Sequence, residues 1–429
     1  MHLTIEKMVY GGDGLSRLPP DERGRGKAVF APFVLPEEQV EASLLEQKPG
    51  FARARAEKIL QPSPHRIEPG CPYFQRCGGC HYQHTTYEHQ LEIKAAILKE
   101  NLRRIAKTGL NQELRVHPSP PWNYRNRTRL KIQTSPEFAL AYYRFNSHDL
   151  LPIETCPISS PLINHAITSF WQLGHSGKVL KTIREVEFFA NADDTALLVE
   201  AYCDAEPEVE TTEQFASELR QVLPLITGIV FLKSQTADQV SKPATVSGAA
   251  DLPYKTQTRS YRVSAGSFFQ VNRYLTDELV KIVTAGHSGT LALDLYAGVG
   301  LFSSVLNREF DNVIAVESSP TSYADLLYNS PANVKAVRAT VEQYVNNVNG
   351  KLRPDLVVVD PPRSGLGDKV IAGLVALGSP HVSYVSCDPA TLSRDLGRLL
   401  QSGYRIEQAH LIDLFPQTYH MESVFHLAR

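Results

Sequence analysis

The last third of the chain alternates short apolar runs with segments of helical length. This alternation is typical of a doubly wound α/β sheet, in which parallel strands are covered by helices on both faces. Two further segments, 404–412 and 423–428, lie about ten residues apart and are predicted to close the sheet as an antiparallel hairpin. The five earlier runs are LALDL (291–295), NVIAV (312–316), VKAVR (334–338), DLVVVD (355–360) and HVSYVS (381–386).

The rest of the chain is expected to form further domains, because 429 residues exceed one ordinary domain. Residues 1–60 show short strand patterns and turn signals, which favour a small oligonucleotide-binding β-barrel over an anonymous β-rich cap. A proline-rich linker, a cysteine cluster, a helix over 86–107 and many strand-like runs follow. We therefore predict an N-terminal barrel (1–60), a central β-rich domain (61–260) whose helix docks on the last domain, and a C-terminal α/β domain (261–429).

Charge and cysteine content narrow the functional classes. The net charge of −2 gives no global field that would attract nucleic acid, although a local basic patch can still do so. The chain begins without a secretory signal pattern and has no apolar run of membrane-spanning length, so a cytoplasmic protein without a membrane partner is expected. Six cysteines in such a protein indicate metal binding or catalysis rather than disulfides.

Functional side chains follow the predicted strands, at the edge where open α/β sheets bind ligands. A glycine loop with Gly298 and Gly300 comes after the first strand, and Glu317 ends the second. The loop exposes backbone N–H groups, and the acid is placed to accept hydrogen bonds from ribose hydroxyls. A glycine pair alone is a weak signal, and Glu317 as a solvated helix cap is the alternative. No Lys-Ser/Thr pair follows the loop, which argues against a triphosphate.

The later strands end in groups suited to covalent chemistry. The fourth is followed by Asp360-Pro-Pro-Arg363, a stiff loop, and the fifth by Cys387, just before a helix start. A helix N-terminus favours the thiolate, so Cys387 is predicted to be a nucleophile rather than a structural thiol. Glu422 precedes the last, antiparallel strand and therefore lies at the same edge, where it is a candidate base rather than a surface acid.

The motifs at this edge resemble those of the tRNA/rRNA (uracil-5-)-methyltransferase family, and the resemblance covers nearly the whole chain. It implies a class I, Rossmann-like methyltransferase sheet, an N-terminal TRAM domain, and methyl transfer from S-adenosylmethionine to carbon 5 of a uridine in RNA. We favour 23S ribosomal RNA over transfer RNA and infer no obligate protein partner. The matching motifs are GSFFQVN (266–272), DLYAGVG (294–300), DPPRSGL (360–366), VSCDPATLSRDL (385–396) and HMESV (420–424).

The resemblance also implies roles for individual residues. It gives Cys387 and Glu422 the same roles of nucleophile and base, and places Phe268 near the target base. This chain departs from the family at Leu301 and Thr340, where asparagine is common, so no cofactor contact is carried over to those positions. The residues expected to bind S-adenosylmethionine are Gln270, Tyr296, Gly298, Gly300, Glu317 and Asp360.

The cysteine cluster predicts a metal site. Cys71, Cys77 and Cys80 are spaced as metal ligands, and Cys156 is available as a fourth thiolate. Four thiolates suit an iron–sulfur cluster or structural zinc, and His81 with its neighbour His84 keeps zinc open. The family resemblance favours a [4Fe-4S] cluster held by Cys71, Cys77, Cys80 and Cys156, with a structural or RNA-positioning role.

A basic segment follows at 122–131, where Arg125, Arg127, Arg129 and Lys131 alternate along a predicted strand with no acid among them. We predict that these side chains form a stripe that contacts RNA phosphates, the alternative being a solvated strand face.

Other functional classes fit the sequence less well. Amino-group methyltransferases carry an aromatic residue where Arg363 stands, and DNA cytosine-5 enzymes place the cysteine after the fourth strand instead of the fifth. A non-catalytic iron–sulfur RNA-binding protein would not need Cys387 and Glu422 beside a complete cofactor loop.

Overall fold

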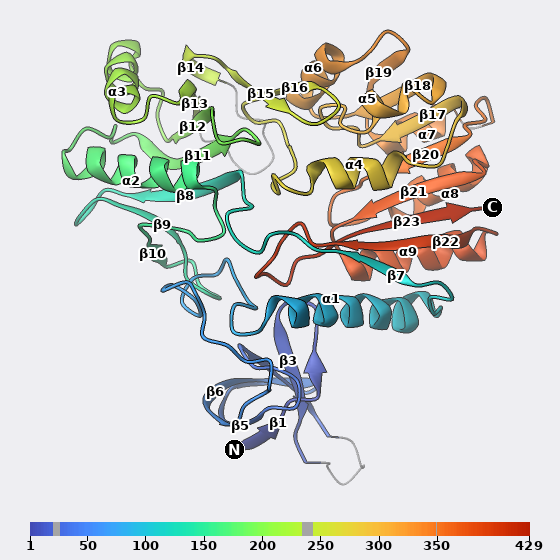
Figure 1. The fold of residues 1–429 in the computed structure, drawn as a ribbon, viewed down its shortest axis with the longest axis horizontal. Coiled ribbons are helices and arrows are strands. Elements are labelled where there is room, and N and C mark those ends of the chain that lie inside the picture. Colours follow the sequence, from blue (N-terminus) through green and yellow to red (C-terminus); the bar gives the residue numbers. More distant parts are fainter. Residues whose placement is uncertain (20–25, 234–242, 349) are drawn as a thin grey trace.

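The computed structural model describes residues 1–19, 26–233, 243–348 and 350–429. Three large sheets follow one another along the chain, and a two-stranded hairpin, β15 (Asp251–Lys255) and β16 (Ser260–Ser264), connects the second to the third. Figure 1 shows the N-terminal sheet in blue at one end of the molecule, with the green central sheet and the orange-red C-terminal sheet side by side at the other.

The N-terminal sheet has six strands in the order β1-β5-β6-β4-β3-β2. All neighbours are antiparallel except β4 and β6, and the long β5–β6 pair carries three register shifts, which bend it. One apolar cluster that includes Leu3, Val29 and Val40 forms its core. The strands are β1 (His2–Thr4), β2 (Lys7–Met8), β3 (Asp13–Arg17), β4 (Ala28–Pro32), β5 (Gln39–Gln47) and β6 (Phe51–Gln61).

The central sheet has seven strands in the order β10-β9-β8-β11-β12-β13-β14. Two helices that the strand-like sequence pattern did not predict, α2 (Pro161–His175) and α3 (Val209–Val222), pack on it around a shared apolar core. The strands are β8 (Arg127–Gln133), β9 (Ala139–Tyr143), β10 (Leu150–Pro152), β11 (Ile183–Ala190), β12 (Leu197–Cys203), β13 (Ile226–Lys233) and β14 (Pro243–Gly248).

The C-terminal sheet has eight strands in the order β19-β18-β17-β20-β21-β23-β22-β7. Its first five strands are parallel and β23 is antiparallel to both neighbours, which confirms the predicted doubly wound sheet with a terminal hairpin. The strands are β17 (Gly289–Leu295), β18 (Phe310–Glu317), β19 (Val334–Arg338), β20 (Leu356–Val359), β21 (His381–Ser386), β22 (Arg405–Ile412) and β23 (Glu422–Ala428).

One strand of this sheet, β7 (Leu114–His117), comes from much earlier in the chain and lies parallel to β22 at the edge. It follows α1 (Tyr87–Asn101) and the π-helical turn η1 (Leu102–Ala106), both of which pack against α9. Figure 1 shows α1 between the N-terminal sheet and the C-terminal sheet. The segment after the cysteine cluster therefore joins the N-terminal and C-terminal parts of the molecule.

Apolar residues on both faces of the parallel strands explain why this sheet is covered on both sides. In β20, Leu356 and Val358 belong to the core on one face, whereas Val357 and Val359 belong to the core on the other. The covering helices are α4 (Thr276–Thr284), α5 (Ser303–Leu306), α6 (Pro320–Asn329), α7 (Val341–Val348), α8 (Gly367–Leu377) and α9 (Pro389–Gln401).

Candidate active site

A cavity of about 590 Å³ opens at the carboxyl edge of the C-terminal sheet, where β17, β18, β20 and β21 end and β23 begins. The segment 266–271, which precedes α4, forms another of its walls. Nearly all the residues predicted for catalysis and cofactor binding therefore line one space; among them only Gly300 does not. The predicted residues that line it are Phe268, Gln270, Tyr296, Gly298, Glu317, Asp360, Cys387 and Glu422.

The glycine loop turns sharply after β17. Tyr296, Gly298 and Gly300 all have positive φ, of 66°, 56° and 91°. The φ of Gly300 favours glycine, and a Cβ there would also press on Leu326 Cδ1, at 2.9 Å. Gly300 thus shapes the loop, whereas Gly298 faces the cavity.

Glu317 already holds the loop in place. Its Oε2 accepts a hydrogen bond from Gly298 N at 2.9 Å, and its Oε1 accepts one from Ser319 N, at the start of α6, at 2.6 Å. A carboxylate has about four acceptor positions, so both oxygens keep capacity for hydroxyl donors in the cavity. The loop-ordering role and the predicted ribose-binding role are therefore compatible.

Two acids with raised pKa values lie at the ends of the neighbouring strands β17 and β20: Asp294 is buried, whereas Asp360 is half-buried and lines the cavity. Asp294 is fully buried; its Oδ2 accepts a hydrogen bond from Ser303 N at 2.8 Å, and burial raises its pKa to about 7. Burial, and after it the neighbouring carboxylate of Asp294, also raises the pKa of Asp360 to about 7. This shift moves the titration of Asp360 toward neutral pH, which makes its side chain a candidate proton donor or acceptor in the cavity.

The predicted activation of Cys387 by the helix dipole is wrong for the free protein. The N-cap residue Asp388 accepts hydrogen bonds from Ala390 N at 3.0 Å and Thr391 N at 2.9 Å, so the first free amides of α9 are already paired. Burial, followed by the acids Glu422 and Asp360, raises the pKa of Cys387 to about 12. The sulfur is consequently a thiol at rest and becomes a nucleophile only when its proton is removed.

This protonation state predicts how Cys387 reacts with iodoacetamide in the free protein. Because only the thiolate reacts, alkylation should be slow at pH 7 and should rise about tenfold per pH unit from pH 7 to pH 10. Peptide mass spectrometry that follows modification at Cys387 measures this directly. Fast alkylation at pH 7 with a plateau above it would instead indicate an activated thiolate.

Glu422, the first residue of β23, is buried, and its Oε1 has no hydrogen-bond partner within the described part of the chain. Burial, and secondarily Asp360, raises its pKa well above the usual range of a glutamate, while Arg363 opposes this shift. Arg363 Nη2 lies 3.3 Å from His420 Nδ1, and both side chains line the cavity. Sequence reasoning did not assign roles to these two, although both lie in the quoted motifs.

The four predicted metal ligands also come together. Cys71, Cys77, Cys80 and Cys156 line a second cavity of about 330 Å³ between the cysteine segment and the central sheet. Burial raises the pKa of Cys77 to about 11 and that of Cys80 further. Over the ranges described, no three His, Cys, Asp or Glu side chains are arranged around a single metal ion.

The predicted phosphate-contacting stripe is contradicted by the register of the central sheet. Strand β8 pairs with β11, which sets Arg129 opposite Glu187 and Lys131 opposite Glu185. Arg129 Nε lies 2.6 Å from Glu187, and Lys131 is paired with Glu185.

The other two arginines of the proposed stripe point into the protein. Arg127 is paired with Glu187 and, at 2.7 Å, with Glu200, and its side chain is only 12% exposed. Arg125 lines the cysteine cavity instead of the surface. The strand is therefore neutralised by acids that the local sequence does not show.

We predict that Arg127→Met lowers the free energy of unfolding by about 3–5 kcal/mol, because it leaves the buried carboxylate of Glu200 without its arginine and removes one of the two arginines that pair with Glu187. The matched control is Arg184→Met, which removes a pair with Asp204 between side chains 49% and 43% exposed and should cost less than about 1 kcal/mol. Urea unfolding followed by circular dichroism compares them. Equal losses would contradict a structural role for Arg127.

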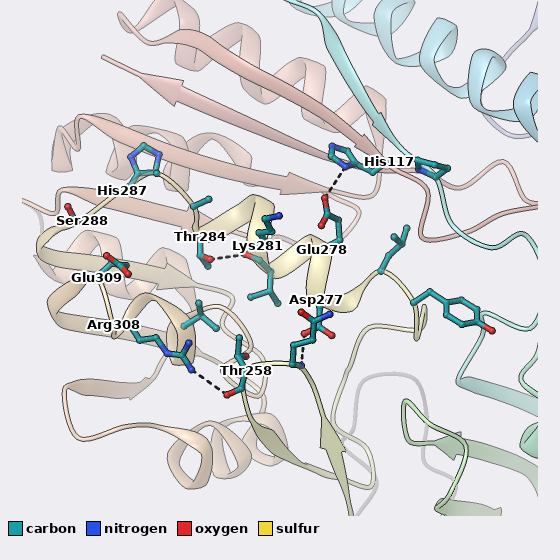
Figure 2. A pocket seen from close by; sticks show the side chains of 18 residues that line it. His117, Thr258, Asp277, Glu278, Lys281, Thr284, His287, Ser288, Arg308 and Glu309 are labelled. Carbon is teal, nitrogen blue, oxygen red and sulfur yellow. Dashed lines mark hydrogen bonds and ion pairs between the residues drawn. The ribbon is translucent and has the colours of Figure 1, made fainter.

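Another cavity, of about 1070 Å³, lies along α4. Figure 2 shows acidic and basic side chains around it, with Glu278 directed at His117, 3.3 Å away, and Arg308 and Glu309 on the opposite side. Its charges are mixed, and it contains none of the predicted site residues.

Comparison with known proteins agrees with this geometry. The profile of the tRNA (uracil-5-)-methyltransferase family matches residues 86–429, which is most of the chain. The chain belongs to this family. It is an RNA methyltransferase by descent, as the family resemblance of its motifs predicted.

Individual relatives cover nearly the full length. An RNA methyltransferase of Aquifex aeolicus is 35% identical over 99% of this chain and 97% of its own. The 23S rRNA (uracil(1939)-C(5))-methyltransferase RlmD of Erwinia tasmaniensis is 32% identical over 94% of this chain and 92% of its own. The crystal structure of the Pyrococcus abyssi tRNA (uracil-54, C5)-methyltransferase in complex with S-adenosyl-L-homocysteine shares the fold, with a TM-score of 0.77 and 24% identity over the whole of both chains.

Within the ranges that the structure describes, none of the helices of this methyltransferase is both long and apolar enough to cross a membrane.

Proposed function

We propose that this enzyme transfers a methyl group from S-adenosylmethionine to carbon 5 of one uridine in RNA, through a transient bond between Cys387 and carbon 6 of the base. The observation that carries the proposal is that Cys387 and the buried Glu422, whose Oε1 has no hydrogen-bond partner among the described residues, line one cavity together with the glycine loop. The 23S rRNA enzyme among the relatives favours ribosomal RNA as substrate. The same chemistry on transfer RNA is the second candidate.

Binding in the cavity divides between cofactor and base. S-adenosylmethionine supplies an electrophilic methyl group when it is bound, and we assign its binding to Gln270, Tyr296, Gly298, Glu317 and Asp360. Phe268 is 65% exposed at the mouth of the cavity. An exposed ring there can stack on a base that has left its helix, which returns about 1–3 kcal/mol of the cost of flipping.

The chemistry begins with the sulfur of Cys387. Its S–H bond breaks as sulfur adds to carbon 6, and the ring electrons move to carbon 5. With the cofactor bound, carbon 5 would take the methyl group as the bond from that methyl to the sulfonium sulfur breaks and the neutral thioether leaves. Asp360 lines the same cavity and its charge acts on Cys387, so its carboxylate is suited to accept the thiol proton. A base then removes the hydrogen of carbon 5, the C5–C6 double bond re-forms, and sulfur leaves carbon 6. Glu422 is assigned as this base because it lines the cavity, and its carboxylate, formed once its own proton has left, binds a proton more strongly than that of an ordinary glutamate.

We assign a [4Fe-4S] cluster to Cys71, Cys77, Cys80 and Cys156. Four thiols line one cavity of about 330 Å³, and four thiolates are the ligand set of such a cluster. His81 and His84 do not line this cavity, which disfavours zinc. Such a cluster would link the cysteine segment to the central sheet, and we further propose that the N-terminal sheet is a TRAM-like RNA-binding module.

An anaerobic preparation tests the cluster assignment. A brown protein that absorbs broadly at the blue edge of the visible range, with about four iron atoms per chain, is expected. A colourless protein that contains zinc would refute the assignment.

RNA that contains 5-fluorouridine tests the proposed reaction. Fluorine at carbon 5 cannot be removed as a proton, so the enzyme, RNA and S-adenosylmethionine should give a covalent complex that survives a denaturing gel. A non-catalytic RNA-binding protein would give none. Quantifying 5-methyluridine in separated ribosomal and transfer RNA, with and without the gene, then distinguishes the two substrates.

A further inference from the structure

We propose that Tyr10, from the N-terminal sheet, is a positioning residue for the nucleophile Cys387; this inference rests on the proposed function. Tyr10 lies in the turn between β2 and β3, 377 positions away from Cys387 in the chain. Its hydroxyl donates a hydrogen bond to the backbone carbonyl oxygen of Cys387, at 3.2 Å. The N-terminal sheet therefore reaches into the loop that carries the reactive sulfur.

Aromatic contacts hold the Tyr10 ring in place. It meets the ring of Tyr419 edge to face, with centroids 5.3 Å apart and an angle of 89° between the planes. Tyr419 also contacts His81, at 4.6 Å, and His420, at 4.1 Å. Edge-to-face pairs of this kind prefer one orientation, so the direction of the hydroxyl is determined by three separate segments of the chain.

The turn that carries Tyr10 packs closely against the cysteine segment that carries His81. The φ at Gly12 is 92°, and a Cβ there would lie 3.0 Å from the ring and Cβ of His81, so a side chain at this position would strain the turn that carries Tyr10 and press on His81. His81 N and Tyr82 N in turn both donate to the carbonyl oxygen of Gln417, in the loop before Glu422. The N-terminal turn, the cysteine segment and the loop before Glu422 thus form one packed unit.

The hydrogen bond supports one side of the peptide between Cys387 and Asp388, whose N–H donates to Ser386 Oγ, at 3.3 Å, on the other side. On the C-terminal side of Cys387, the capping bonds of Asp388 fix the start of α9. The 387 carbonyl orients the peptide plane between that cap and the sulfur-bearing residue, so a donor at this oxygen limits the directions in which the Cys387 side chain can point. Burial keeps the pKa of Tyr10 well above its ordinary value, so the hydroxyl stays protonated and remains a donor.

The role of the N-terminal sheet is consequently wider than holding RNA. It contributes a side chain that supports the nucleophile, so a displacement of this module would change the position of the Cys387 peptide. Since displacing a reacting atom by about 1 Å can cost about a hundredfold in rate, even a small rotation of the 387 peptide matters.

Tyr10→Phe in the full-length enzyme tests the inference, with Tyr404→Phe as the matched control. Tyr404 also donates its hydroxyl to a backbone carbonyl, that of Ser379 at 2.9 Å, but lies outside the catalytic cavity. We expect Tyr10→Phe to lower kcat, and the rate of adduct formation with 5-fluorouridine RNA, by about fivefold to tenfold. KM for RNA and the dissociation constant of S-adenosylmethionine should stay within about twofold, and Tyr404→Phe should leave all four quantities unchanged.

Three outcomes would overturn the inference. One is a Tyr10→Phe enzyme with normal kcat and adduct rate; another is a raised KM for RNA with normal kcat, which would make Tyr10 an RNA contact. The third is an equal loss of activity in Tyr404→Phe, which would indicate general destabilisation. Failure of the proposed function is distinguishable from failure of this inference, because the wild-type enzyme would then form no adduct with 5-fluorouridine RNA.

Discussion

Cys387→Ala should abolish methyl transfer, with a loss of about 10⁴-fold or more, while the enzyme still folds and binds S-adenosylmethionine. Without the sulfur, carbon 6 of uracil has no covalent partner, and carbon 5 remains too poor a nucleophile to take the methyl group. The side chain contributes to the wall of the cavity and makes no side-chain hydrogen bond within the described residues, so its loss should disturb little else. Transfer of labelled methyl groups to RNA measures the effect.

The matched control for this variant is Cys203→Ala. Cys203 is fully buried in β12, away from both cavities, so its replacement removes a thiol without touching the proposed chemistry. Wild type and Cys203→Ala should both form the adduct with 5-fluorouridine RNA, whereas Cys387→Ala should form none. An adduct that persists in Cys387→Ala would move the nucleophile to another residue, and normal turnover would exclude covalent catalysis by this cysteine.

The sequence predicts that the candidate catalytic residues lie together, because their positions follow from the topology of the sheet. Runs that are apolar on both faces identify parallel strands, and parallel strands end at one edge of a sheet. Cys387, Glu422 and Asp360 therefore had to lie near each other once the strands were recognised. The motif positions needed no knowledge of side-chain packing, and the structure places these residues around one cavity.

The basic strand could not be interpreted in the same way, because its neighbours are set by pairing across the sheet. Arg127 and Arg129 meet Glu187, which lies 60 and 58 positions away in β11. The local sequence contains no acid, and nothing in it specifies which strand pairs with β8. Charge patterns within one strand therefore say little about surface charge until the register is known.

Two other errors had signals in the sequence. Asp388-Pro389 is a strong helix start. The aspartate accepts hydrogen bonds from the first amides of α9, so these amides are paired with an acid next to Cys387. Ser160-Pro161 marks the start of α2 in the same way, and Ser160 Oγ accepts from Ile163 N. Both capping residues are visible in the sequence: Asp388 indicates that the first amides of α9 are paired, and Ser160 indicates that a helix starts at Pro161.

Glu422→Gln should trap the methylated intermediate on ordinary RNA. Glutamine keeps the shape of the side chain but cannot accept the proton of carbon 5, so sulfur cannot be expelled after methyl transfer. Turnover should fall by about 10²–10⁴-fold, the usual contribution of a positioned base, while a Cys387–RNA complex accumulates on a denaturing gel. Stability should not fall, because burial already disfavours the charged form of Glu422 and a neutral amide avoids that cost.

The control variant is Glu342→Gln, an exposed acid of α7 that pairs with Lys369 and should behave as wild type. The double variant Cys387→Ala/Glu422→Gln should form no complex, which ties the trapped species to the sulfur. Asp360 is the competing base, since it raises the pKa of both Cys387 and Glu422 and shares their cavity. If Asp360→Asn accumulates the methylated complex and Glu422→Gln turns over normally, the two carboxyl groups exchange roles, and Glu422 becomes the acceptor of the thiol proton.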